Sequence, residues 1–288
     1  MTRVLIFGGS GMMGHTVFRV LSARPDLNVF VTLRGFGLAR SFPDDLRARL
    51  ISGVDMLDLD AVAGCLEHVR PNVVINCTGL VKQSNAASDP LVAIPINALV
   101  PHRLSRLSAL VGARFIHMGT DCVFRGDRGG YTEDDRPDAD DLYGRSKLLG
   151  EVDGSHAVTL RTSIIGRELR SKHGLLEWFL NSSGTVRGYV NAIFSGLTTD
   201  ELARVIADHV IPNPALNGIL NVSVAPISKY DLLLLLREAY GHRVEIIPET
   251  AFSIDRSLDS TRFRSLTGYQ PPEWPAMVSR MREQGEWA

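Results

Sequence analysis

The segment Val4–Gly14 reads VLIFGGSGMMG, and the rest of the chain can be placed around it. Its first four residues form a continuous apolar run, which is typical of a strand that is buried on both faces. Beyond it, Met13, Val17 and Leu21 keep the spacing of an amphipathic helix. Gly8, Gly11 and Gly14 therefore stand at a strand-to-helix turn. There they allow a tight turn and a close approach of the backbone to a pyrophosphate, so the segment predicts a dinucleotide site.

The second predicted strand, residues 28–33, ends at Arg34. The residue after this strand reads the adenosine ribose of a bound dinucleotide, and an acidic residue suits NAD whereas an arginine suits the 2′-phosphate of NADP. No acid occurs at positions 32 to 34, so the sequence favours NADPH. The alternative is an exposed loop arginine, as the neighbouring Arg40 would also be.

Further apolar runs alternate with helical patterns. We predict strands at residues 49–54, 73–75 and 114–118, followed by Asp55, by Asn76–Gly79 and by Thr120, respectively. This alternation indicates an α/β fold: a Rossmann-type, doubly wound parallel sheet with the cofactor across the carboxyl ends of its strands. We expect residues 1–162 to form the cofactor-binding domain. Residues 163–288 would mainly form a smaller substrate-binding region, with some elements returning to the sheet.

Composition excludes several classes of function. The chain has 288 residues and a formal net charge of −1, so no electrostatic footprint for nucleic acid or an anionic membrane is present. No apolar run approaches the ~20 residues of a membrane span. The three cysteines, Cys65, Cys77 and Cys122, have no CxxC spacing and imply neither a disulfide framework nor a metal site. We expect a cytoplasmic protein.

A second motif, Tyr143-Gly144-Arg145-Ser146-Lys147, follows the fifth strand and a polar, glycine-rich loop. On a helix, Tyr143 and Lys147 lie one turn apart on the same face. We expect the nearby ammonium to lower the pKa of the phenol. Thr120, at the end of the preceding strand, can converge on the same point. The three side chains together predict a proton-delivery site for a carbonyl or alcohol oxygen.

Together these motifs resemble the extended short-chain dehydrogenase/reductase family and, within it, the dTDP-4-dehydrorhamnose reductase group. The resemblance runs over essentially the whole chain. It is carried by the glycine turn, Asn76-Cys77-Thr78-Gly79, Asn97-Ala98, Gly119-Thr120-Asp121-Cys122-Val123-Phe124, Leu142–Lys147 and Leu160-Arg161-Thr162-Ser163.

The resemblance implies roles for individual residues. Thr120, Tyr143 and Lys147 match the catalytic triad; Lys147 also holds the nicotinamide ribose. Asp55 and Met56 match positions that contact adenine, and Met12 and Met13 offer backbone amides to the pyrophosphate. Cofactor contacts are also implied for Cys77, Thr78 and Gly79. Lys82, Asp121 and Cys122 lie where the sugar should sit, and Arg256 lies where related enzymes place a basic residue near the diphosphate of the substrate.

The activity that the resemblance implies is NADPH-dependent reduction of the C4 ketone of a nucleotide-linked 4-keto-6-deoxyhexose, in the synthesis of deoxysugars and cell-surface polysaccharides. Three departures concern the sugar: Cys122 replaces a tyrosine, Ile164 an aromatic residue, and Leu80-Val81-Lys82-Gln83 the usual loop. A UDP-linked 2-acetamido-4-keto-2,6-dideoxyhexose is therefore an alternative substrate. A packing role is the other interpretation of Cys122.

Other functions of related proteins fit the motifs of this sequence less well. A dehydratase carries Asp-Glu after the threonine, and here the second position is Cys122. An epimerase retains NAD, which Arg34 disfavours. A non-catalytic NADP-binding protein, like the similar regulatory subunit of methionine adenosyltransferase, is disfavoured by the intact Thr120, Tyr143 and Lys147. The sequence leaves the oligomeric state open, and a homodimer is the assembly we consider.

Two side-chain placements are also predicted. Trp178 and Phe179, on a helix at residues 175–180, are expected in the core, whereas Asn97 is a polar helical residue that could be exposed.

Overall fold

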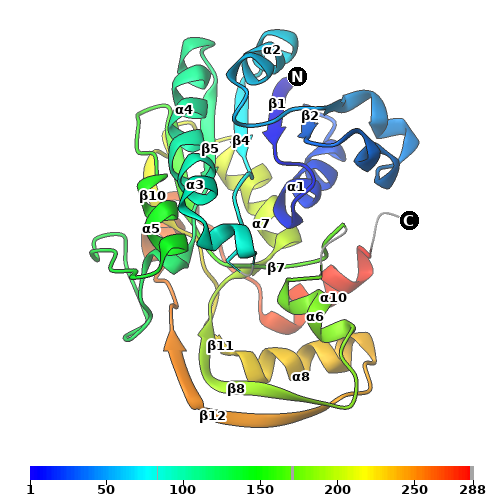
Figure 1. Ribbon diagram of the computed structural model, residues 1–288, viewed down its shortest axis with the longest axis vertical. Helices are drawn as coiled ribbons and strands as arrows, with labels where there is room; N and C mark the ends of the chain where they lie inside the picture. Colours follow the sequence, from blue (N-terminus) through cyan, green and yellow to red (C-terminus); the bar gives the residue numbers. More distant parts are fainter. Residues whose placement is uncertain (83, 170–171, 286–288) are drawn as a thin grey trace.

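The computed structural model describes residues 1–82, 84–169 and 172–285. A seven-stranded sheet with helices on both faces forms the larger part of the molecule (Figure 1). Its strand order is β10-β6-β5-β4-β1-β2-β3, and every neighbouring pair is parallel. The strands are β1 (Thr2–Phe7), β2 (Leu27–Leu33), β3 (Leu50–Ser52), β4 (Val73–Asn76), β5 (Arg114–Met118), β6 (Ala157–Arg161) and β10 (Gly218–Asn221). The predicted doubly wound parallel sheet is confirmed.

Strand β1 shows why the sheet is covered on both sides. Val4, Leu5, Ile6 and Phe7 are all completely buried. Because side chains alternate along a strand, Val4 and Ile6 enter one apolar core whereas Leu5 and Phe7 enter the other. The first core also contains side chains of helices α1 (Met12–Ser22), α7 (Thr199–Val205) and α8 (Lys229–Tyr240). The second contains side chains of α2 (Leu59–Val69) and α4 (Val100–Leu110).

The remaining helices connect or cover these elements. They are α3 (Pro90–Ala93), α5 (Leu142–Leu149), α6 (Leu175–Leu180), α9 (Thr261–Thr267) and α10 (Trp274–Glu283). A π-helical stretch, Ile94–Leu99, joins α3 to α4, and another, Ile206–Val210, extends α7. Within the part of the chain that the structure describes, no helix is both long and apolar enough to cross a membrane.

A second sheet was not predicted from the sequence. It has the order β11-β8-β12 and lies at the lower end of the molecule with α8 beside it (Figure 1). Its strands are β8 (Thr185–Phe194), β11 (Ile227–Ser228) and β12 (Glu245–Asp255). A short parallel pair is formed by β7 (Ile164–Ile165) and β9 (Leu197–Thr198), which precede and follow β8 in the sequence. Strand β10 joins the large sheet, so the proposed boundary after residue 162 would not be a simple division of the chain.

Two of the predicted side-chain placements need correction. Phe179 is completely buried as expected. Trp178 is 43% exposed, because it lies on the face of the short helix α6 that is opposite the buried face. Asn97 is 1% exposed rather than solvated. Its amide is satisfied inside the protein, where it receives a hydrogen bond from the Leu80 N–H (3.0 Å) and donates one to Ser146 Oγ (3.1 Å).

Two helical glycines allow a matched test of packing at the first turn. A Cβ atom on Gly14 would lie 2.1 Å from the carbonyl oxygen of Gly8, whereas one on the exposed Gly64 of α2 would meet nothing within 4 Å. We expect Gly14→Ala to lower the free energy of unfolding by about 1–3 kcal/mol through overpacking. Gly64→Ala should instead raise it by ~0.5–1 kcal/mol, because alanine loses less entropy in a helix. Urea denaturation of both variants provides the comparison, and equal effects would contradict it.

Candidate active site

The turn after β1 has a different reason for each of its glycines. Gly8 has a φ of +95°, a conformation that L side chains rarely adopt, and Gly14 packs directly against it. Gly11 has a φ of −83° and its Cβ would have no protein atom closer than 3.5 Å. The protein itself therefore permits a side chain at Gly11. An open backbone surface at the N-terminus of α1 is what a pyrophosphate requires, so these residues fit a dinucleotide.

A cavity of about 360 Å³ opens beside this turn. Its wall combines the N-terminal end of α1, the segments that follow β4 and β5, helix α5, and residues of the C-terminal part. It is lined among others by Met12, Met13, Cys77, Thr78, Gly79, Lys82, Thr120, Asp121, Cys122, Tyr143, Lys147, Ser163, Lys229 and Arg256. Residues from both halves of the sequence thus share one cavity at the carboxyl ends of the parallel strands, where ligands bind in such sheets.

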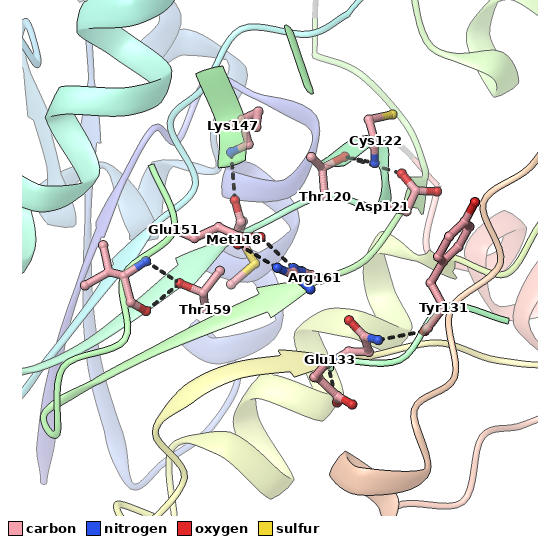
Figure 2. A network of polar contacts seen from close by, with 12 residues as sticks. Met118, Thr120, Asp121, Cys122, Tyr131, Glu133, Lys147, Glu151, Thr159 and Arg161 are labelled. Atoms are coloured by element: carbon pink, nitrogen blue, oxygen red, sulfur yellow. Dashed lines mark hydrogen bonds and ion pairs between the residues drawn. The ribbon is translucent and has the colours of Figure 1, made fainter. Parts of the chain in front are cut away.

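Lys147 is the most deeply buried cation of this wall. It is 5% exposed, and its Nζ donates a hydrogen bond of 2.8 Å to the carbonyl oxygen of Met118, at the end of β5 (Figure 2). Burial lowers the pKa of this lysine to about 8, although Glu151 and the two cavity cysteines act in the opposite direction. The ammonium therefore remains mostly protonated at neutral pH.

Tyr143 corrects one expectation. Its pKa is raised from the ordinary value rather than lowered. Burial is the largest cause, Cys122 and Asp121 contribute in the same direction, and a hydrogen bond with Thr120 acts against them. The proximity of Lys147 does not reverse this effect, because the ammonium is directed to the Met118 carbonyl and desolvation of the phenolate prevails. The phenol is thus fully protonated at neutral pH.

Thr120 begins a 3₁₀ turn, Asp121–Val123, that shapes the wall opposite Lys147. Its Oγ1 accepts a hydrogen bond from the Cys122 N–H (3.2 Å) and donates one to Asp121 Oδ1 (3.3 Å) (Figure 2). Ser163 Oγ donates to the other carboxylate oxygen of Asp121 at 2.7 Å. Burial nevertheless raises the pKa of Asp121. Burial also raises the pKa of the Cys122 thiol to about 12, so this residue is a neutral side chain of the cavity wall.

A buried ion pair between Arg161 and Glu151 connects elements that form the cavity wall. Arg161 at the end of β6 contacts Glu151 through two hydrogen bonds, from Nε (2.6 Å) and Nη2 (2.8 Å), and both side chains are less than 5% exposed (Figure 2). The guanidinium lies 5.3 Å from the ring centroid of Phe124. Because Glu151 follows α5 and Phe124 follows the Thr120 turn, this pair fixes both walls of the site relative to β6.

Comparison with known proteins agrees with this geometry. Residues 1–210 match the model of the RmlD substrate binding domain family, which is almost three quarters of the chain. The protein belongs to this family.

Individual relatives match shorter parts of the chain. Methionine adenosyltransferase 2 subunit beta of Mus musculus is 31% identical over 149 residues, which are 52% of this chain and 41% of that protein. The dTDP-4-dehydrorhamnose reductase of Mycobacterium tuberculosis is 40% identical over 112 residues, 37% of this chain and 36% of that one. The chain therefore matches less than half the length of these relatives.

A solved structure matches the whole fold. The dTDP-4-dehydrorhamnose reductase of Bacillus anthracis in complex with NADP has a TM-score of 0.79, with 21% identity over 99% of this chain and 100% of that one. At this identity the likeness shows that the two chains share a fold.

The cofactor residues expected from the sequence and from its resemblance to the short-chain dehydrogenase/reductase family are distributed over two places. Met12, Met13 and the Cys77–Gly79 segment line the cavity. Arg34, Asp55 and Met56 are not among its lining residues; Arg34 and Asp55 are exposed and follow β2 and β3 in the sequence. Their contacts with a cofactor stay predictions.

All four predicted substrate residues line the cavity. Lys82 already has a carboxylate partner, because its Nζ lies 2.5 Å from Asp141 Oδ2. Arg256 is held by a hydrogen bond of 2.7 Å from its Nε to the carbonyl oxygen of Phe124. Gln83, the last residue of the unusual loop, lies outside the described residues.

Sequence reasoning missed Lys229, the first residue of α8, which also lines the cavity. One signal was available. Helices favour acidic residues in the first turn, because their N-terminus carries a partial positive charge. A lysine directly after the N-cap Ser228 contradicts that preference and therefore asks for another explanation.

The pKa of Lys147 predicts a pH-dependent stability. Its pKa is about 8 in the folded protein and 10.5 in the reference state, so between these values only the unfolded chain carries the proton. The contribution of Lys147 to stability therefore rises with pH from about 8 to about 10.5, and the buried ammonium is destabilising below that window. Relative to the parent, Lys147→Met should lose about 1–3 kcal/mol of unfolding free energy between pH 7.5 and pH 10. Denaturant titrations at both values measure this change.

The exposed Lys172 provides the control, since Lys172→Met should keep a constant difference from the parent at both pH values. A constant difference for Lys147→Met as well would contradict the burial of its ammonium.

Proposed function

We propose that this protein uses NADPH to reduce the C4 ketone of a nucleotide-linked 4-keto-6-deoxyhexose. The observation that carries the proposal is that Thr120, Tyr143 and Lys147 share one cavity with the pyrophosphate-type turn. The reductases among the relatives of this family support the same activity. NADPH, when bound, supplies the hydride, and the Gly8–Gly14 turn with Met12 and Met13 would hold its diphosphate.

The three side chains divide the remaining work. Tyr143 would donate the proton to the C4 oxygen, and its raised pKa keeps that proton in place at neutral pH until the ketone accepts hydride. Thr120, which lines the same cavity, would donate a hydrogen bond to the same oxygen. Lys147 is protonated and would stabilise the phenolate that forms when Tyr143 has given up its proton.

The identity of the sugar depends on the other wall of the cavity. Cys122 lines it with a small, neutral side chain where relatives of the reductase group have a tyrosine. The space that this exchange leaves favours a bulkier substituent, so a UDP-linked 2-acetamido-4-keto-2,6-dideoxyhexose is our second candidate substrate. Incubating the protein with dTDP-, UDP- and GDP-linked 4-keto-6-deoxy sugars and following NADPH oxidation discriminates among them.

A second function is a non-catalytic NADP-binding subunit. It is favoured by the 31% identity to methionine adenosyltransferase 2 subunit beta. Quenching of NADPH fluorescence together with no turnover of any keto sugar would establish it and exclude the reductase. We further propose that residues 1–162 bind the cofactor, that residues 163–288 mainly bind the substrate, and that the protein forms a homodimer.

Removal of the phenol tests the chemistry. We expect Tyr143→Phe to lower turnover by ~10²–10⁴-fold, because the proton donor is lost. The dissociation constant of NADPH should stay within a few-fold of the parent, since the ring still packs. Steady-state kinetics and fluorescence titration provide the two values. Turnover like that of the parent would contradict the assignment of Tyr143 as the proton donor.

Cofactor choice is tested at the end of β2. A contact from Arg34 to the 2′-phosphate is charge-assisted, so Arg34→Ala should weaken NADPH by roughly ten- to a hundred-fold and leave NADH little changed. Arg40, another exposed arginine six residues further on, serves as the matched control. The prediction fails if Arg34→Ala weakens both cofactors equally or if the parent prefers NADH.

A further inference from the structure

Lysines are concentrated in the cavity. Of the 31 lysines and arginines in the chain, only four are lysines. Three of these four line this one cavity: Lys82, Lys147 and Lys229. Arg256 is the arginine among its lining residues. The chain as a whole is almost neutral, with a net charge of −1, so an excess of lysine over the whole chain does not explain the three lysines of this cavity.

Two of the three lysines have partners within the protein. Lys147 binds the Met118 carbonyl and Lys82 binds Asp141. Lys229 is different, because across residues 1–82, 84–169 and 172–285 its ammonium has no hydrogen bond or ion pair. Burial lowers its pKa and Arg256 and Lys82 act in the same direction, whereas Asp121 and Cys122 of the same cavity raise it. In the described part of the chain Asp121 makes no ion pair with Lys229, and a half-buried ammonium without a directly bound anion is unfavourable.

The helix does not account for Lys229. Ser228 caps α8, with its Oγ accepting a hydrogen bond from the Asp231 N–H at 2.9 Å. A cation in the first turn opposes the helix dipole, whereas the partial positive charge of the same turn attracts an anion. Asp231 of this turn already complements the dipole, so Lys229 is the charge of the turn that gains from a negatively charged ligand.

Strand register places Lys229 and Arg256 on either side of β8, each one residue beyond the level of Ile193. Ile193 of β8 pairs with Ser228 of β11 on one side and with Asp255 of β12 on the other. Lys229 and Arg256 are the next residues. Because β11 runs antiparallel and β12 parallel to β8, Lys229 continues toward the level of Ala192 and Arg256 toward that of Phe194. Both side chains line the same cavity. Strands two apart are separated by about 10 Å, a gap that two long side chains can close around a ligand.

Arg256 is also held ready for an anion. Its Nε is occupied by the Phe124 carbonyl, and its stem packs against Gly126, where a Cβ would lie 2.7 Å from Arg256 Cγ. For the described residues, no hydrogen bond to either Nη atom is present. A guanidinium fixed in this way presents its remaining donors in the planar geometry that suits phosphate oxygens.

We propose that Lys229 and Arg256 form a two-cation clamp for the diphosphate of the substrate, with Lys229 binding the phosphate that lies at the N-terminus of α8. The inference rests on the proposed function, since it takes the cavity to bind a nucleotide-linked sugar. Among the described residues Lys229 and Arg256 form no ion pair with a carboxylate, and two cations match the two negative charges of an esterified diphosphate. Lys229 then gives the small sheet a direct part in choosing diphosphate-linked substrates.

Calorimetric titration of the NADP-saturated protein with dTDP, UDP and GDP tests the clamp without requiring turnover. Lys229→Gln should weaken the diphosphate that binds best by roughly ten-fold or more, as expected for loss of a charge-assisted contact. Lys229→Arg should restore most of the affinity. Arg237→Gln is the matched control, because it removes an exposed positive charge from the same helix and should change nothing.

Stability separates binding from folding. Lys229→Gln removes a cation from a helix N-terminus, so its melting temperature should equal or exceed that of the parent. An unchanged dissociation constant in this folded variant overturns the clamp. If the variant does not fold, acetylation of the parent followed by mass spectrometry decides instead: the diphosphate should slow modification of Lys229 several-fold and leave the exposed Lys172 unaffected. Equal rates overturn the proposal.

The outcomes also separate this inference from the proposed function. A parent that binds a diphosphate through Lys229 but oxidises no NADPH retains the clamp and refutes the reductase. A parent that reduces a keto sugar while Lys229→Gln binds diphosphate normally retains the reductase and refutes the clamp. A parent that binds none of the three diphosphates refutes the clamp directly.

Discussion

The hydrogen bond from the Lys147 ammonium to the Met118 carbonyl is the contact on which the site depends. It joins α5 to the carboxyl end of β5, and it is made by a cation that is almost completely removed from water. A charge in that position is tolerated only with a well-placed partner. Asn97 provides the second connection, since it links the segment after β4 to Ser146, the neighbour of Lys147. Together these contacts hold three loops around one cavity.

Burial has opposite consequences for the two titratable groups of α5. It raises the pKa of Tyr143 and lowers that of Lys147, because each group resists its charged form. A tyrosine and a lysine at the surface have similar pKa values. Here the pKa of Tyr143 lies above its ordinary value and the pKa of Lys147 lies below it. At neutral pH the phenol therefore keeps its proton, while Lys147 is still mostly protonated.

The central sheet could be predicted from the sequence because its signals are local. The run before Gly8 is apolar throughout, Asp58 and Ser228 are N-cap residues of a type that helices favour, and the strands before Thr78 and Thr120 are short and continuous. The small sheet could not, since β8 is interrupted by Gly188, and β12 contains Pro248 and an irregularity between Glu249 and Ser253. For the same reason Lys229 was missed: it lines the same cavity as Arg256 because β11 and β12 both pair with β8, and no local pattern contains that pairing. Asn97 likewise has partners at Leu80 and Ser146 that are distant in sequence.

Gly11 differs from Gly8 and Gly14 in the physical reason for which a glycine is needed at its position. Gly8 is required by its backbone conformation and Gly14 by its contact with Gly8, so folding alone preserves both. At Gly11 the protein has room for a methyl group, and only a molecule lying against the turn would exclude it. Changes at this position therefore escape any selection for stability or expression. In a library of variants sorted by abundance, Gly11 would behave as a tolerant surface site, and only sorting by ligand occupancy would reveal that it is constrained.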